Sequence, residues 1–143
     1  MSISLVTPSK PKMKCPCCSG KMYAECCELL HKGSYPSNAL SLMRSRYSAY
    51  ALQNPSYIMR TTDSDNSHWQ ADQGKWGKEI MRFCLTTEFV KLEIIDFTDG
   101  EESATVTFIA HLRQANHPML LKEKSFFVKK GPQWLYQSGV MAE

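Results

Sequence analysis

The pattern of apolar positions changes its period once along the chain, near Leu85. Before this point, apolar residues recur every three or four positions, which is the repeat of an amphipathic helix. After it, apolar and polar residues alternate with a period of two, as in a strand that buries one face. The order of the two patterns predicts helices first and a run of strands afterwards.

Three helical segments are expected in the first part of the chain. The clearest runs from residue 36 or 37 to about residue 52. Four of its apolar residues share one face: Leu40, Met43, Tyr47 and Tyr50. Arg44 and Arg46 are expected to point elsewhere. They could clamp an anionic group, but arginines on a helix face usually pair with carboxylates of their own chain, which is the outcome expected here. Shorter segments are expected over residues 56–61 and 71–85, the latter with a stripe of Trp76, Ile80 and Phe83.

Four strands joined by short turns are expected in the second part. They cover residues 89–97, 104–113, about 120–129 and 134–137. Asp99-Gly100 and Asn116-His117-Pro118 supply the first two turns, and the Ile94-Ile95 pair breaks the alternation in a way that predicts a bulge. The fold class is therefore α+β, with helices packed on one face of a curved antiparallel four-stranded meander.

Five of the six cysteines fall within residues 15–27. The spacing is C-x-C, then eight residues, then C-C, and it selects Cys15, Cys17, Cys26 and Cys27. Four thiolates this close together suit a tetrahedral Zn²⁺ ion, with Zn–S bonds of about 2.3 Å. The alternatives are reduced thiols, or a redox pair of adjacent cysteines at 17–18 or 26–27.

The metal-site pattern favours a structural role over a catalytic one. Four protein ligands leave no open position for a water molecule, so we expect one structural Zn²⁺ and do not favour an enzyme. The cysteine module is too small to bury a core, so the metal must hold it together. We therefore expect a flexible arm over 1–14, a zinc knuckle over 15–33 and a larger domain over 34–143. His31 could replace a ligand, although a surface position is more typical.

Composition and charge narrow the classes of function. The chain has 143 residues, 43% hydrophobic and 22% charged, which are ordinary values for a globular domain. Its net charge of +3 lies within residues 1–32, which hold five lysines and two glutamates. A zinc tetrathiolate, at −2, would offset part of this excess, so nucleic-acid binding is only weakly indicated. With no membrane-length apolar run and no secretory signal, we expect a cytoplasmic protein.

A few other residues are candidates for chemistry. Cys84 lies on an apolar helix face and is expected to be a small buried hydrophobe. His111 and Glu123 lie on neighbouring strands, where they could form an acid–base pair around a small ligand, although an ordinary satisfied pair is the commoner outcome. His68 and His117 are expected in exposed loops.

The cysteine pattern C-P-C-x8-C-C resembles the SEC-C motif, the zinc knuckle also found in the protein-translocation ATPase SecA. Residues 42–50, which read LMRSRYSAY, and the later runs EKSFF (123–127) and WLY (134–136) are similar to the YchJ family of small bacterial proteins. The resemblance implies a SEC-C knuckle joined to a cone-shaped domain of the nuclear transport factor 2-like class. Cys18 stands where that family usually has glycine, so strain is expected if φ is positive there. Alternatively, Cys18 could compete with Cys17 as a metal ligand.

Three functions are compatible with these features. The leading one is a non-enzymatic zinc-binding protein whose knuckle contacts a protein partner, with a link to protein export or translation implied by analogy with SecA. The alternative is a cone that binds a small molecule or acts as an enzyme, with a pocket between sheet and helices. The weaker alternative is nucleic-acid binding by the basic N-terminal module.

Overall fold

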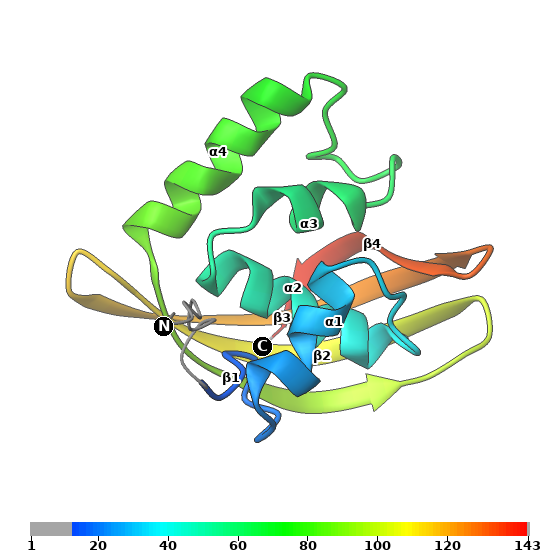
Figure 1. Cartoon of the computed structure of the whole chain (residues 1–143), viewed down its shortest axis with the longest axis horizontal. Helices are drawn as coiled ribbons and strands as arrows, with labels where there is room; N and C mark the ends of the chain where they lie inside the picture. The colour runs from blue at the N-terminus through cyan, green and yellow to red at the C-terminus, as the bar shows by residue number, and fades with distance from the viewer. Residues whose placement is uncertain (1–12, 143) are drawn as a thin grey trace, which may run out of the picture.

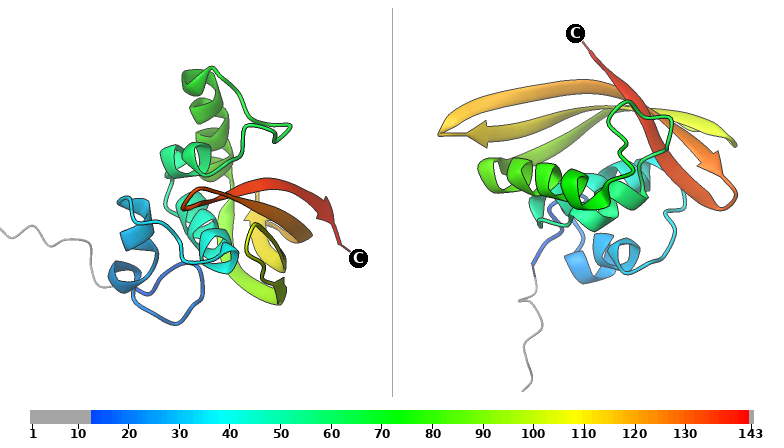
Figure 2. Two further views of the ribbon diagram at one scale, coloured as in Figure 1. Left: turned by 90° about the vertical axis from the view of Figure 1, so that its right-hand side faces the viewer. Right: turned by 90° about the horizontal axis from the view of Figure 1, so that it is seen from above.

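The computed structural model describes residues 13–142 of the chain, and most of the expected flexible arm lies outside these residues. The described chain forms two layers (Figures 1 and 2). A curved antiparallel sheet makes one layer, and the helices lie together on one side of it. The cysteine module packs beside the central helix, at the lower front of Figure 1. This is the α+β arrangement that the order of the patterns predicts.

The helices begin where capping side chains stand. The elements are a 3-10 turn at Tyr23–Glu25, α1 at Cys27–His31, α2 at Ala39–Ala51, α3 at Pro55–Arg60 and α4 at Gln73–Thr86. Asn38, Asn54 and Asp72 cap α2, α3 and α4, because the side-chain oxygen of each accepts a hydrogen bond from a backbone N–H in the first turn. The three predicted helical segments are confirmed within a few residues at their ends.

The strands are β1 at Glu88–Thr98, β2 at Ser103–Gln114, β3 at His117–Lys130 and β4 at Gln133–Met141, paired in the order β1-β2-β3-β4. The bulge predicted at Ile94-Ile95 is present as a register shift between Ile94 and Asp96. A second shift between Phe89 and Lys91 was not predicted. Val90, which lies at this second shift, is 46% exposed.

The turn between β2 and β3 lies earlier than the sequence suggested. Ala115 and Asn116 have φ values of 49° and 66°, which are the two positive values of a type I′ hairpin. His117 and Pro118 therefore belong to β3 and pair with β2. Pro118 is tolerated in β3 because β4 pairs with β3 only from Glu123 onward. The edge of β3 that faces away from β2 is therefore unpaired at Pro118.

Helix α2 lies at the centre of the core. Its apolar face packs against the inner face of the sheet, which is made of Val106, Phe108, Ala110 and Leu112 on β2. Other residues of α2, including Leu42, Ser45 and Ala49, are fully buried away from the sheet. The helix is thus covered on more than one side, because the cysteine module and α3 pack against it. No helix within residues 13–142 is long and apolar enough to cross a membrane.

Candidate metal centre and ligand pocket

A small hairpin positions the first two cysteines of the cluster. Lys14 and Met22 form an isolated antiparallel bridge, and the Cys15 N–H donates to the Lys21 carbonyl at 2.8 Å. The turn between them carries Cys17, while the 3-10 turn and α1 that follow present Cys26 and Cys27. Gly33, with φ of 129°, ends this segment as the sequence predicts.

The structure brings the four predicted cysteines together. The sulfur atoms of Cys15, Cys17, Cys26 and Cys27 all lie within 4.8 Å of one another. Two of the separations are 3.7 Å, between Cys17 and Cys26, and 3.9 Å, between Cys26 and Cys27. A tetrahedron with metal–sulfur bonds of about 2.3 Å has edges of about 3.8 Å. The cluster therefore has the dimensions of a metal-binding site with four thiolate ligands.

The thiols of this cluster cannot all ionise without a cation. Hydrogen bonds from Cys15 and Cys27 lower the pKa of Cys17, whereas the bonds of Cys27 to Cys15 and Cys17 raise the pKa of Cys27. Burial raises the pKa of Cys26. One thiolate is thus stabilised by protonated neighbours, and only a bound metal ion makes four thiolates favourable in so small a volume.

Cys18 lies outside the cluster. It is exposed and has φ of 64°, the left-handed conformation expected for a position that usually holds glycine. Its sulfur accepts a hydrogen bond from the backbone N–H of Leu92 at 3.4 Å, on edge strand β1. Cys17, by contrast, is fully buried among the other ligands. Of these two adjacent cysteines, only Cys17 belongs to the group of four that could hold a metal ion.

The knuckle is fixed to α2 by polar contacts. The Arg44 guanidinium donates to the Cys17 carbonyl at 2.7 Å, and the Ser48 hydroxyl lies 3.3 Å from the Cys15 sulfur. His31 is hydrogen-bonded through one ring nitrogen to the Tyr23 hydroxyl at 2.7 Å and through the other to the Ser45 carbonyl at 2.8 Å. His31 is therefore neither the surface histidine expected nor a member of the metal-binding group, but a bridge between α1 and α2.

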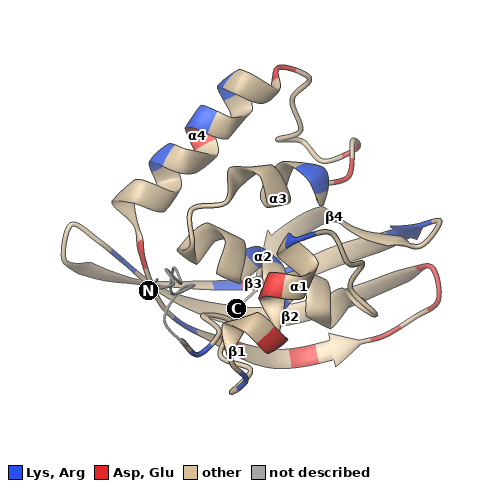
Figure 3. Cartoon of the chain, in the orientation of Figure 1, with Lys and Arg blue, Asp and Glu red and all other residues tan. Residues whose placement is uncertain are grey.

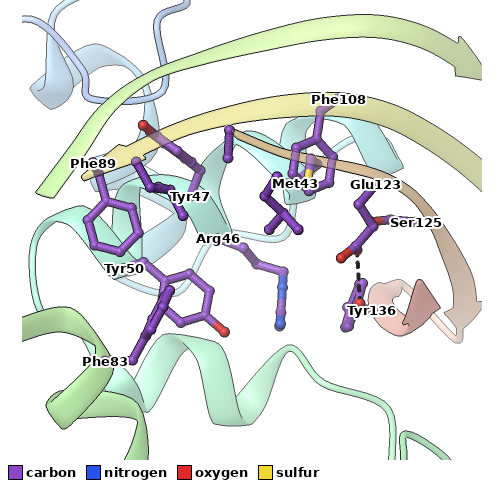
Figure 4. Close-up of a pocket in the computed structure, with 13 residues that line it drawn as sticks. Met43, Arg46, Tyr47, Tyr50, Phe83, Phe89, Phe108, Glu123, Ser125 and Tyr136 are labelled. Atoms are coloured by element: carbon purple, nitrogen blue, oxygen red, sulfur yellow. Dashed lines mark hydrogen bonds between the residues drawn. The ribbon is translucent and has the colours of Figure 1, made fainter. Parts of the chain in front are cut away.

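A cavity of about 220 Å³ lies between α2, α4 and the inner face of the sheet (Figure 4). Its lining is mostly apolar and aromatic, with contributions from Met43, Phe83, Phe89, Phe108 and Leu112. It adjoins a wider hollow of about 590 Å³. Five residues border both: Arg46, Tyr50, Phe83, Glu123 and Tyr136. The cone of the fold is thus not filled by side chains, and polar groups converge where its two parts meet.

Glu123 is the acidic group of this cavity. Its Oε2 accepts hydrogen bonds from the Ser125 hydroxyl at 2.5 Å and the Tyr136 hydroxyl at 3.0 Å (Figure 4). Gly139 makes this arrangement possible, because a Cβ at this position would collide with the Glu123 carboxylate. Burial and the nearby Glu123 charge raise the pKa of Tyr136, so that this phenol remains a hydrogen-bond donor.

The acid–base pair considered for His111 and Glu123 does not form. His111 pairs in register with Leu120 and Glu123 with Phe108, which places the two side chains on opposite faces of the sheet. His111 is hydrogen-bonded instead to Glu93 of β1. Cys84 is buried as predicted, and burial raises its pKa, which keeps the thiol neutral. His68 and His117 are exposed as predicted, although His117 lies in β3 and not in a loop.

The prediction that Arg44 and Arg46 pair with carboxylates is wrong. Within residues 13–142 neither takes part in an ion pair. Arg46 points into the core and is only 7% exposed, because α2 has no solvent-facing side at that turn. Tyr136 and Gly139 are also site residues that periodicity did not reveal. The one signal for Arg46 was a second arginine, two residues after Arg44, in a helix whose other residues are small, apolar or tyrosine.

A four-cysteine knuckle followed by helices and an antiparallel meander defines a SEC-C motif protein with a nuclear transport factor 2-like domain. The family profile described as "YchJ, middle NTF2-like domain" matches residues 38–139. The chain is 35% identical over 130 residues to a UPF0225 protein from Sodalis glossinidius, an alignment that covers 87% of this chain and 81% of that one. The chain belongs to this YchJ-like family of bacterial proteins.

Two solved structures are similar over nearly the whole chain. A SEC-C motif containing protein from Rhodopseudomonas palustris is 30% identical and superposes with a TM-score of 0.79, covering 92% of this chain and 100% of its own. A SEC-C motif containing protein from Psychrobacter arcticus is 26% identical with a TM-score of 0.73, covering 90% and 82%. The likeness extends from the knuckle through the sheet.

Proposed function

We propose that the protein holds one structural Zn²⁺ ion in its knuckle and binds a small molecule in the cone. Cys15, Cys17, Cys26 and Cys27 are the ligands in this proposal. Four sulfurs at tetrahedral spacing suit zinc, and they fill its coordination sphere with protein atoms. The ion then supplies folding free energy to a segment without a core of its own, and no reaction is assigned to it.

One observation carries the second half of the proposal. Arg46, Tyr50, Glu123 and Tyr136 converge from two sides on an otherwise apolar cavity. A concave apolar site with a few convergent polar groups is the usual form of a small-molecule site. The sequence alone favoured the knuckle as the functional surface. Because the cone contains an open cavity, we now favour ligand binding. We do not propose catalysis, because His111 lies on the other face of the sheet from the cavity.

Metal content tests the zinc proposal. We expect one zinc per chain by elemental analysis, and four thiols that react with a thiol reagent only after chelation. Cys18 should react at once because it is exposed, whereas Cys84 should react only on unfolding. A Cys26→Ser variant should lose zinc affinity, while Cys84→Ala should retain it. Zinc-free protein with an undiminished unfolding temperature would contradict the proposal.

Ligand-observed nuclear magnetic resonance with a library of small aromatic and aliphatic compounds tests the cone. Leu121→Phe is the informative variant, because Leu121 is a partly buried residue that lines the cavity. We expect binding by the natural chain and its loss in this variant, with the unfolding temperature preserved. Compounds that bind both chains equally would place the binding elsewhere and count against the cone.

A protein contact through the knuckle is the second candidate. Leu29 and Tyr35 are 54% and 58% exposed beside the metal cluster, next to a hollow that Cys26 and Cys27 help to line. Exposed apolar side chains around a hollow are typical of interaction sites. The test is affinity capture with the full zinc-loaded chain against a Leu29→Asp/Tyr35→Asp double variant, because the knuckle packs on α2 and is not an independent unit. Equal capture by both would remove this candidate, and with it the implied link to export or translation.

Nucleic-acid binding gains no support. Lys10 and Lys12 lie outside the described residues, and elsewhere basic and acidic residues are interspersed along the elements (Figure 3). A nucleic-acid footprint needs basic residues gathered on one face.

A further inference from the structure

Arg46 is a buried cation without an anionic partner. Its side chain is 7% exposed, and no carboxylate within residues 13–142 forms an ion pair with it. Three neutral oxygens hold it in place: the Ile58 carbonyl at 3.1 Å and the hydroxyls of Thr61 and Thr62 at 2.9 and 3.0 Å. A buried charge compensated only by neutral groups is unfavourable unless an anion comes to it.

The free donors of Arg46 border the cavity. The three hydrogen bonds that fix the side chain all use Nη1, which leaves the N–H groups of Nη2 and Nε for further acceptors. The guanidinium extends between the rings of Tyr50 and Tyr136 (Figure 4), with its central carbon 4.6 Å from the Tyr136 ring centre. Burial raises the pKa of Tyr50, and the positive charge of Arg46 opposes the rise, so this hydroxyl lies near the same cation.

Glu123 is not the missing anion. It lies beyond ion-pair distance from Arg46, and its carboxylate already accepts from Ser125 and Tyr136. The Glu123 carboxylate therefore has hydrogen-bond donors around it. The Arg46 guanidinium, by contrast, still has N–H donors without acceptors. Tyr47, which is 3% exposed and lines the same cavity, has a hydroxyl with no partner in the described chain. The lining as it stands is short of hydrogen-bond acceptors.

We propose that the ligand of the cone is a small organic carboxylate with an apolar body. This inference rests on the proposed function, that the cone binds a small molecule. The carboxylate lies against the Nη2 and Nε side of Arg46 and accepts a further hydrogen bond from Tyr50. The apolar body occupies the aromatic end of the cavity, among Phe83, Phe89 and Phe108. Arginine suits this role because its planar fork matches the two oxygens of a carboxylate.

The size of the cavity limits the apolar body. A cavity of about 150 Å³ holds benzene, so the 220 Å³ here accepts one ring with a short side chain. Glu123 limits the ligand to one negative charge, because a second negative group on the ligand would lie near the Glu123 carboxylate across the cavity. The class is therefore a monocarboxylate, aromatic or branched aliphatic, and not a sugar phosphate or a nucleotide.

A matched pair of probes tests the inference on the natural chain. Phenylacetate and phenylacetamide have the same shape and differ in charge. Isothermal titration calorimetry of the zinc-loaded full chain should show phenylacetate binding at least about tenfold more tightly. Equal affinity for the two probes would overturn the carboxylate assignment and leave small-molecule binding standing. Binding of neither probe, with no hit from the wider library, would overturn both proposals.

Variants locate the carboxylate. Tyr50→Phe removes one donor and keeps the ring, so phenylacetate affinity should fall several-fold while phenylacetamide is little changed. Arg46→Lys keeps the charge without the fork and should reduce the preference for the acid. Arg113→Met is the control, because it removes the same charge from the opposite face of the sheet, where Arg113 pairs with Glu88. If Arg113→Met lost the preference for phenylacetate over phenylacetamide to the same extent, the preference would reflect general attraction to a basic protein. This result would overturn the carboxylate site at Arg46.

Discussion

The guanidinium of Arg44 donates a 2.7 Å hydrogen bond to the backbone carbonyl of Cys17, a member of the four-cysteine cluster. The bond joins the turn of the knuckle to helix α2 of the body. Charge-assisted hydrogen bonds of this kind are stronger than neutral ones. The position of the knuckle therefore depends on a residue that lies outside the SEC-C motif itself.

Replacing Arg44 should loosen the knuckle. We expect Arg44→Met to lower the free energy of unfolding of the zinc-loaded chain by about 1.5–3 kcal/mol, and to speed the loss of zinc to a chelator. Chemical denaturation and a colorimetric chelator assay measure the two effects. Arg113→Met, on the outer face of the sheet, should change neither. An unchanged rate of zinc loss in Arg44→Met would show that the contact does not hold the knuckle.

Cys18→Gly should stabilise the protein. The residue has φ of 64°, and the left-handed conformation costs a residue with a Cβ about 1–2 kcal/mol. Glycine removes this strain but loses the contact of the sulfur with the Leu92 N–H, so we expect a net gain of about 1 kcal/mol. Cys18→Ala is the control, since it removes the thiol and keeps the strain. Equal stability of the glycine and alanine variants in urea would refute the strain argument.

Gly139→Ala should disturb the cavity. The new Cβ would collide with the Glu123 carboxylate and lie 2.7 Å from the Tyr136 hydroxyl, so the bond between them must break or shift. We expect a loss of about 1–3 kcal/mol, measured by thermal and chemical unfolding. Gly77→Ala in α4 is a matched control, because its Cβ would meet only the Met59 methyl at 3.5 Å. There alanine should be neutral or stabilising.

Asp63 should make stability depend on pH in the acid range. Burial alone would raise its pKa, but the hydrogen bond and charge of Lys130, at 2.5 Å, and the Asp65 N–H lower it below the ordinary 3.8. Because the folded pKa is the lower one, the stabilisation is present above pH 3.8 and is lost as pH falls through the folded value.

The matching experiment is urea unfolding of the natural chain and Asp63→Asn as a function of pH. We expect a gap of about 2 kcal/mol near neutral pH that narrows as the pH falls below 3.8 and closes below the lowered pKa of Asp63. Asp99→Asn, in the exposed turn after β1, should show no such gap. A gap that stays constant across this range would mean that the Asp63 charge does not stabilise the fold.

Periodicity predicted the elements well because it records which side of each element faces the core. It found the bulge at Ile94-Ile95, and the spacing of the cysteines identified the four that cluster. Periodicity missed the burial of Arg46. A spacing of three and four residues describes a helix with one buried face, whereas α2 is buried on more than one face. Periodicity also missed the contact of Glu123 with Tyr136, since this depends on the pairing of β3 with β4 and on the missing side chain of Gly139.

The position of the four-cysteine cluster along the chain bears on the order of folding. All four cysteines and the helix that supports them lie before residue 52, whereas the cavity is complete only when Tyr136 and Gly139 are in place. Contacts that are close in sequence form with less loss of chain entropy. During synthesis, the knuckle and α2 leave the ribosome together before any strand exists. We therefore expect them to form the first ordered unit, on which the sheet later assembles.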